Sequence, residues 1–483
     1  MASIKRNYAY NILLNLSRVI FPLVTAPYIS RVLEPDGIGL FNFASTYANY
    51  FALFAVLGIP TYGIREVAKI REDREALSRL VSELISVSLF STLVVTAIYL
   101  PSIFLIGQLN ENYVIFLVSG ILLYLAPFRI DWFFSGLEQF GYITLRTLII
   151  RTVSIACMFL FVHTRSDLLL YVILNVVGTV GGDVWNYLRL FRLGIKPRLV
   201  VQGLKQHLSS LFVLFTASIA ISVYTVLDTL MLGFMTDYRE TGFYNNPMHI
   251  SRALLAVVTS LSAVAIPRIS QYCKEGVYEE IQDLANKSFS VVAFLSVPIA
   301  VGIACIAPVF VPLFFGAEFG GSIAPLMALG FLVIAVGLNN LFGLQLLVAM
   351  NLDRFFLYSI LAGTVTNFVL NICLIPHWGA FGASISSVVA EFLIVVVMVV
   401  FLYKQTFLRF DQVFPDLLKA FVGAVLFLPT IWILRHWLAG WTLVFAFFIS
   451  GSFLFCISQK VLKNSFIEIV LPEIDCKVFK KNG

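Results

Sequence analysis

The first hydrophobic segment carries an arginine at a depth where arginine is rarely tolerated. One face of a helix here would carry six polar or helix-bending residues, spaced by three and four positions: Asn7, Asn11, Asn15, Arg18, Pro22 and Thr25. If a helix over residues 9–31 spans a bilayer, Arg18 lies within about 5 Å of the midplane, at ~1.5 Å rise per residue. A lipid-facing guanidinium costs at least ~2.5–3.5 kcal/mol there, so Arg18 should face a protein interior or a wet cavity.

Other ionisable residues fall in apolar segments of the first half: Arg129, Asp131, Arg146, Arg151 and Asp183. A guanidinium offers a planar fork of donors that matches phosphate oxygens, and it stays charged when desolvated. Arginines gathered at this depth favour an anionic ligand. An amphipathic anion, such as a lipid carrying a phosphate or pyrophosphate, would place its head in the cavity and its tail in the bilayer.

For each of these arginines, a purely structural role is the alternative to binding a ligand. Arg18 and Arg151 fall near the centres of their segments, which favours lining a cavity over a purely structural ion pair. Arg129 and Arg146 fall nearer the cytoplasmic ends, where anchoring at the interface competes with binding a ligand. Asn15 shares the face of Arg18, which makes it a further candidate for substrate binding.

The second half contributes a different set, Asp228, Arg252 and Glu391. Arg252 is a candidate substrate ligand, and a structural pair with Asp228 is the alternative. Asp183 and Glu391 both fall mid-segment, where a buried carboxylate can carry a proton or bind a cation. We therefore predict ion coupling by Asp228, Asp183 or Glu391, with helix-packing hydrogen bonds as the alternative.

Two prolines mark the first segment as a candidate gate. Pro22 and Pro27 remove backbone donors and permit a bend. A bent helix that lines a cavity is an element that a moving gate could use.

The composition requires these residues to be held by membrane-spanning helices. Of 483 residues, 59% are hydrophobic and only 12% are charged, whereas soluble domains have about 25% charged residues. Apolar runs long enough to cross a bilayer follow one another almost without pause. We predict an all-α polytopic membrane protein with about fourteen spans, near 9–31, 40–60, 82–106, 113–134, 142–162, 168–192, 210–234, 243–267, 288–311, 322–348, 354–375, 380–402, 414–435 and 438–459.

The distribution of basic residues predicts the orientation. With both termini cytoplasmic, the cytoplasmic segments hold 23 of the 33 Lys and Arg residues, and the opposite loops hold four. This bias also accounts for the net charge of +6 without a nucleic-acid partner.

An internal repeat indicates two similar halves. A shift of 203 residues places Gly39-Leu-Phe-Asn42 on Gly242-Phe-Tyr-Asn245, and Arg65 on Arg268. An offset by an even number of spans preserves orientation. We expect two pseudo-symmetric six-helix bundles, 1–209 and 210–404, and a region 405–483 with two extra helices and a basic cytoplasmic tail.

The sequence lacks the common motifs of nucleotide-binding, metal-dependent and hydrolytic enzymes. It has no Walker motif, no HExxH, no GxSxG and no clustered metal ligands. We therefore expect a transporter rather than an enzyme, with no cofactor and no metal.

Several motifs together resemble the bacterial oligosaccharide flippases of the multidrug/oligosaccharidyl-lipid/polysaccharide exporter superfamily. The resemblance covers residues 7 to about 404. It rests on the order and spacing of Pro22-Leu-Val-Thr-Ala-Pro27-Tyr-Ile-Ser-Arg31, Asp36-Gly37-Ile-Gly39, Tyr62-Gly63-Ile-Arg65-Glu66, Asp131-Trp-Phe-Phe-Ser-Gly136, Tyr224-Thr-Val-Leu-Asp228, Asn367-Phe-Val-Leu-Asn371 and Ile375-Pro376-His-Trp-Gly379. Glu34 departs from the usual glycine before Pro35, and Asn245-Asn246-Pro247-Met-His249 replaces the usual start of the eighth span.

The resemblance implies two lobes around a central cleft that alternates its access. It implies movement of an undecaprenyl-pyrophosphate-linked oligosaccharide repeat unit from the cytoplasmic to the periplasmic leaflet of the bacterial inner membrane, coupled to a proton or sodium gradient. Arg18, Arg129, Arg146 and Arg151 match the cationic cavity of that family. Membrane lipid and other polysaccharide-assembly membrane proteins are candidate partners.

Two alternatives remain. A cation-coupled drug or metabolite exporter of the same architecture would favour a site of Asp, Glu and aromatic residues, against the arginine excess seen here. A membrane scaffold in a polysaccharide-synthesis complex would leave the mid-membrane arginines unexplained.

Overall fold

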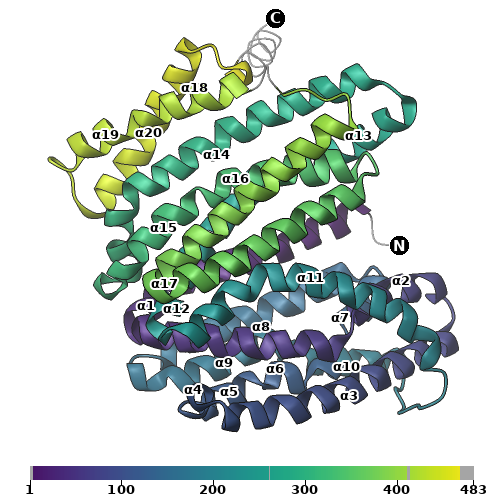
Figure 1. Ribbon diagram of the computed structural model, residues 1–483. Coiled ribbons are helices and arrows are strands. Elements are labelled where there is room, and N and C mark those ends of the chain that lie inside the picture. The colour runs from purple at the N-terminus through teal and green to yellow at the C-terminus, as the bar shows by residue number, and fades with distance from the viewer. Residues whose placement is uncertain (1–3, 260–261, 411–413, 468–483) are drawn as a thin grey trace, which may run out of the picture. The chain divides into compact units, whose positions relative to one another are not determined.

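The computed structural model describes residues 4–259, 262–410 and 414–467 (Figure 1). These residues form helices, and no strand occurs among them. The chain divides into two compact units, Met1–Gly242 and Phe243–Gly483. The basic tail predicted at the C-terminus falls mostly in 468–483, outside the described residues.

Unit 1 is organised around its long first helix, which packs against α3, α8 and α11. Its helices are α1 (Ile4–Val56), α2 (Ile59–Ile70), α3 (Arg74–Leu105), α4 (Gly107–Asn110), α5 (Tyr113–Ser119), α6 (Ile121–Tyr124), the 3₁₀ helix η1 (Ala126–Phe128), α7 (Asp131–Gly136), α8 (Phe140–Phe161), the 3₁₀ helix η2 (Arg165–Asp167), α9 (Leu168–Val180), α10 (Gly182–Arg192), α11 (Lys205–Met235) and the first turns of α12 (Tyr238–Thr259).

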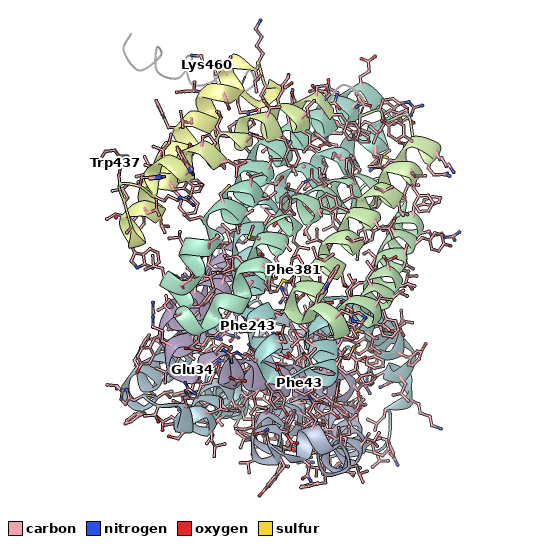
Figure 2. The ribbon with its side chains drawn as sticks, turned by 60° about the vertical axis from the view of Figure 1, so that its left-hand side comes forward. Glu34, Phe43, Phe243, Phe381, Trp437 and Lys460 are labelled. Atoms are coloured by element: carbon pink, nitrogen blue, oxygen red, sulfur yellow. The ribbon has the colours of Figure 1, made fainter. Side chains whose placement is uncertain are left out.

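Unit 2 is built on α14, against which α15, α16, α18 and α20 pack. It contains the rest of α12 and then α13 (Ser262–Glu275), α14 (Tyr278–Phe315), the 3₁₀ helix η3 (Ala317–Ser322), α15 (Ile323–Gly330), α16 (Leu332–Asn339), the π-helix η4 (Asn340–Val348), α17 (Asp353–Gln405), α18 (Phe414–Val425), α19 (Phe427–Leu434) and α20 (Gly440–Val461). Exposed Trp437 precedes α20, and Lys460 lies near its far end (Figure 2), as interfacial anchors do.

The polytopic membrane fold is confirmed. Over the described residues, nine helical stretches are long and apolar enough to cross a membrane, and Tyr113–Phe128 and Val226–Met235 are shorter apolar helices. Ala9–Val56 has 48 residues and Asp353–Gln405 has 53. At ~1.5 Å per residue each is roughly twice as long as a ~30 Å hydrocarbon core requires. Each therefore covers two of the predicted spans.

A local break divides each of these long helices. In α1 the non-helical residue is Glu34 (Figure 2), and its backbone angles are φ 57° and ψ 177°. Pro35 follows it, and proline disfavours the helical conformation of the preceding residue. In α17 the break is at Gly379, with φ 50°, a conformation that glycine adopts at little cost.

One helix boundary follows the repeat of 203 residues seen in the sequence. The break at Glu34 corresponds to the gap between α11 and α12. The boundary found by compactness lies within α12, after Gly242, whereas the sequence predicts bundles that meet near residue 209. The division into bundles stays a prediction.

Candidate functional site

Arg18 and Arg151 lie at the same level on two parallel helices of unit 1. The Thr144 hydroxyl on α8 donates to the carbonyl of Tyr10 on α1 at 3.1 Å, and the Tyr28 hydroxyl donates to the carbonyl of Val162 at 2.7 Å. Both bonds join positions 134 apart, so the two helices run in the same direction. The same offset brings Arg18 level with Thr152, which follows Arg151 directly. The charge of Arg18 acts on Arg151.

Neither of these two guanidinium groups is paired within the described residues by a hydrogen bond or an ion pair. Arg18 is exposed and Arg151 is half-buried. Like charges on adjacent helices repel, and this repulsion is stronger away from bulk water. An anion placed between the two side chains would relieve the repulsion, and the long side chains can reach it.

The polar face next to Arg18 is local and exposed. The Asn15 amide donates to Oδ1 of Asn11 at 3.1 Å, one turn earlier on α1. Pro22 and Pro27 both lie inside α1 with helical backbone angles. Because Pro22 has no N–H, the carbonyl of Arg18 loses its usual helical partner. A gating role for the two prolines stays a prediction.

Arg146 lies in a different environment from Arg18 and Arg151. Its Nη2 donates to both carboxylate oxygens of Asp131, at 2.8 and 3.1 Å, and its Nη1 donates to the Gly182 carbonyl at 3.2 Å. The side-chain amide of Asn186 donates to Oδ1 of Asp131 at 2.8 Å. The Arg146 side chain is 7% exposed and that of Asp131 is 49% exposed. Arg146 is therefore held inside the helices and is already neutralised.

Arg129 and Asp131 line a cavity of about 380 Å³ within unit 1. Its other walls come from the second half of α1, from Pro60 and Trp132, and from Val226 on α11. The polar side chains from α1 are Thr46, Asn49 and Tyr50. A cavity of this volume is within the range of small-molecule sites. Arg129 is half-buried, so its charge is available to the space that the cavity encloses.

The predicted ion-coupling residues lie in three separate environments. Asp183, on the first turn of α10, is buried beside the Arg146 network. Asp228 is buried on α11 of unit 1. Glu391 is buried on α17 of unit 2, where its Oε2 accepts a hydrogen bond from the Asn339 amide of α16 at 2.9 Å. Arg252, on α12 in unit 2, is exposed.

Sequence reasoning missed the partners of these residues. Asn186 was detectable, because it follows Asp183 by three positions and so shares its helical face. The buried hydrogen-bonded cluster of His207, Tyr62 and Glu83 was not detectable from the sequence, because its members come from three distant segments. His207 contacts the Tyr62 hydroxyl through Nδ1 at 2.7 Å and Glu83 through Nε2 at 2.9 Å. It ties the start of α11 to α2 and α3.

The charged connector at α2 is satisfied by its own side chains. Glu66 accepts hydrogen bonds from Lys69 and Arg65, each at 2.9 Å. Partial burial alone would raise the pKa of Glu66, but these two bonds outweigh it and leave that pKa below its ordinary value. The arrangement fits a solvated connector better than a binding site.

Relatives of the chain carry names of transporters and flippases. It is 24% identical to a putative O-antigen transporter of Escherichia coli (strain K12) over 416 residues, covering 84% of this chain and 98% of that protein. It is 23% identical to the lipid II flippase MurJ of Bacillus subtilis (strain 168) over 445 residues, covering 77% and 79% of the two chains.

The fold is similar to that of a solved flippase. The structure of lipid II flippase MurJ in an inward closed conformation matches with a TM-score of 0.71 at 14% identity, over 96% of this chain and all of that one. At this identity the match supports the fold alone. The family model described as polysaccharide biosynthesis protein matches residues 4–273, more than half of the chain. These matches confirm the resemblance to oligosaccharide flippases, and the chain belongs to the polysaccharide biosynthesis protein family.

Proposed function

We propose that this protein is an alternating-access flippase for undecaprenyl-pyrophosphate-linked oligosaccharide repeat units. It moves them from the cytoplasmic to the periplasmic leaflet of the bacterial inner membrane, for assembly of O-antigen, capsule or exopolysaccharide. Both termini lie in the cytoplasm, and an ion gradient drives the cycle. Support comes from the family match, and from relatives whose names denote an O-antigen transporter and a lipid II flippase.

The observation that carries the proposal is the pair Arg18 and Arg151. Two unpaired guanidinium groups at one level of adjacent apolar helices form a site for a multiply charged anion. A pyrophosphate has enough oxygens for both groups, and its polyprenyl chain is compatible with the surrounding bilayer. Asn15 adds a neutral donor on the face of Arg18.

The other arginines take separate roles in this proposal. Arg129, at the cavity with Asn49 and Tyr50, is placed to meet sugar hydroxyls. Arg146 is occupied by Asp131 and acts by positioning that carboxylate. Arg252 stays a candidate ligand contributed by unit 2. A drug exporter is not favoured, because two adjacent cations repel the cationic compounds that such exporters carry.

The test is leaflet transfer in reconstituted liposomes with a fluorescent undecaprenyl-pyrophosphate oligosaccharide. Arg18→Ala and Arg151→Ala should each reduce transfer at least tenfold, and Arg18→Lys should restore little of it, because an ammonium lacks the planar fork. Arg192→Ala, at an exposed arginine on α10, is the matched control and should transfer normally. Full transfer by both alanine variants would refute the assignment of the head-group site.

A further inference from the structure

Asp183 and Asn186 present two buried oxygen atoms that lack hydrogen bonds. Asp183 is 6% exposed and Asn186 is fully buried. Oδ2 of Asp183 and Oδ1 of Asn186 have no partner among the residues that the structure describes. The two residues are three positions apart on α10, so they share one face of that helix. Buried polar atoms are seldom left in this condition.

The charged groups around Asp183 come from several elements. Asp131 of α7, Arg129 after η1 and Arg146 of α8 all act on it electrostatically, as Asp183 does on the Tyr187 hydroxyl of its own helix. Helix α9, which also packs against α10, has no charged residue between Leu168 and Val180.

A glycine allows the guanidinium of Arg146 to lie against this helix. A Cβ at Gly182 would be only 2.8 Å from Nε of Arg146, closer than such atoms normally approach. Arg146 uses Nη1 and Nη2 in hydrogen bonds, but its buried Nε–H has no partner among the described residues. One unused donor therefore accompanies the two unused acceptors.

We infer that Asp183 is a proton-binding group that exchanges with the cavity lined by Arg129 and Asp131. In the protonated form its carboxyl O–H supplies the donor that Asn186 Oδ1 lacks. In the ionised form its carboxylate accepts from Nε of Arg146. Uptake converts one hydronium ion to water and the carboxylate to a carboxylic acid, and no other bond changes. The inference rests on the proposed function, because it assigns one coupling ion of the flippase.

The surroundings favour a proton over a metal cation. Two guanidinium groups act on Asp183, and they oppose the binding of any cation beside it, so the choice between a proton and a metal rests on the available ligands. The two free oxygens are few for a metal, and the described residues contain no group of three or more His, Cys, Asp or Glu side chains that could hold one. A proton needs a single acceptor and no coordination shell.

Asn186, on the same face of α10 as Asp183, links this face to the cavity. Asn186 lies beside Asp183 on one side and donates to Asp131 on the other. Asp131 is half-exposed and lines the cavity with Arg129. If ionised Asp183 draws Arg146 toward itself, Asp131 loses part of its neutralising partner, and the charge facing the cavity becomes more negative. Proton release would then weaken the hold on an anionic substrate.

Infrared titration of the purified full chain in detergent tests the inference without requiring transport. The carbonyl stretch of a protonated carboxyl group should disappear as pH rises, and Asp183→Asn should remove that component. Glu391→Gln is the control and should leave it unchanged, because Glu391 lies in unit 2 with its own partner. Asn186→Leu should shift the frequency of the Asp183 component, because the acceptor of its O–H is gone. This variant also serves if Asp183→Asn fails to fold.

Two results would overturn the inference. One is an Asp183→Asn spectrum identical to that of the wild type across the titration. The other is a titration midpoint that moves by one pH unit for a tenfold rise in sodium chloride but not in choline chloride, which would identify a sodium site. The proposed function is judged separately by leaflet transfer. A protein that titrates as expected and transfers no lipid-linked oligosaccharide keeps the proton site and loses the flippase assignment.

Discussion

The two halves of the Arg146–Asp131 ion pair should differ in what their removal costs. Asp131→Ala leaves a guanidinium that is 7% exposed without its counter-charge, and stranding a buried charge costs about 3–5 kcal/mol. Because the Asp131 side chain is 49% exposed, water already weakens the pair, so we expect about 3 kcal/mol. Arg146→Met leaves a carboxylate that still reaches water and the Asn186 amide. The cost should be about 1–2 kcal/mol, chiefly the lost bond to Gly182.

Thermal unfolding in detergent, followed by tryptophan fluorescence, measures this difference. Trp132 follows Asp131 in the sequence and Trp185 precedes Asn186, so the fluorescence of both reports on this region. For a unit of this size 1 kcal/mol shifts the midpoint by about 2–4 °C. Asp131→Ala should therefore lower the midpoint by about 6–12 °C and Arg146→Met by about 2–8 °C.

The double variant tests the ion pair itself, because it removes both charges together. Asp131→Ala with Arg146→Met should be more stable than Asp131→Ala alone, because no buried charge is left unpaired. Arg192→Ala should unfold like the wild type. A larger loss for Arg146→Met than for Asp131→Ala, or additive losses in the double variant, would refute the assignment of Arg146 as the buried partner.

Three further changes probe the supports of unit 1. Gly39→Ala should destabilise the fold by at least ~1–3 kcal/mol, because its Cβ would collide with the backbone carbonyl of Tyr238, and the yield of monodisperse protein should fall. His207→Ala should expose the connector before α11 to limited proteolysis, since it leaves buried Glu83 without its imidazole partner; unchanged cleavage would argue against this anchor. Arg165→Ala removes the ion-pair partner of Glu34. It should change the unfolding midpoint little, because the Arg165 side chain is 70% exposed and an ion pair with so exposed a partner contributes ~0–1 kcal/mol.

Local patterns were sufficient to predict the helices and the class of protein. Apolar runs and the loop charges depend on the immediate contact of each segment with lipid or water, so they can be read one segment at a time. The repeat of 203 residues likewise reappears in the structure, where the break at Glu34 in α1 corresponds to the gap between α11 and α12. The break in α1 also falls where the predicted spans 9–31 and 40–60 leave a connection, at Glu34 before Pro35. The bend suggested by Pro22 and Pro27 is a separate prediction, and both prolines lie in helical backbone.

The candidate site was only partly predictable, because its residues are sorted by contacts between helices. From the sequence Arg18, Arg129, Arg146 and Arg151 form one cationic group. In the structure Arg146 is bound to Asp131, and Arg129 lines the cavity. Which arginine finds a counter-charge depends on how α7 and α8 face each other, and no spacing within one helix records that.

The sequence by itself determined that this chain spans a membrane repeatedly and places an arginine near the middle of its first span. The spans follow from the high cost of lipid-exposed charge, which is a property of each segment alone, and the depth of the arginine follows from its place in the first apolar run. Only the tertiary structure decided which residues act together. The parallel register of α1 and α8, set by the bonds at Tyr10 and Tyr28, brings Arg151 level with Arg18. That register arises from packing between segments more than a hundred residues apart, so it becomes visible only in the folded protein.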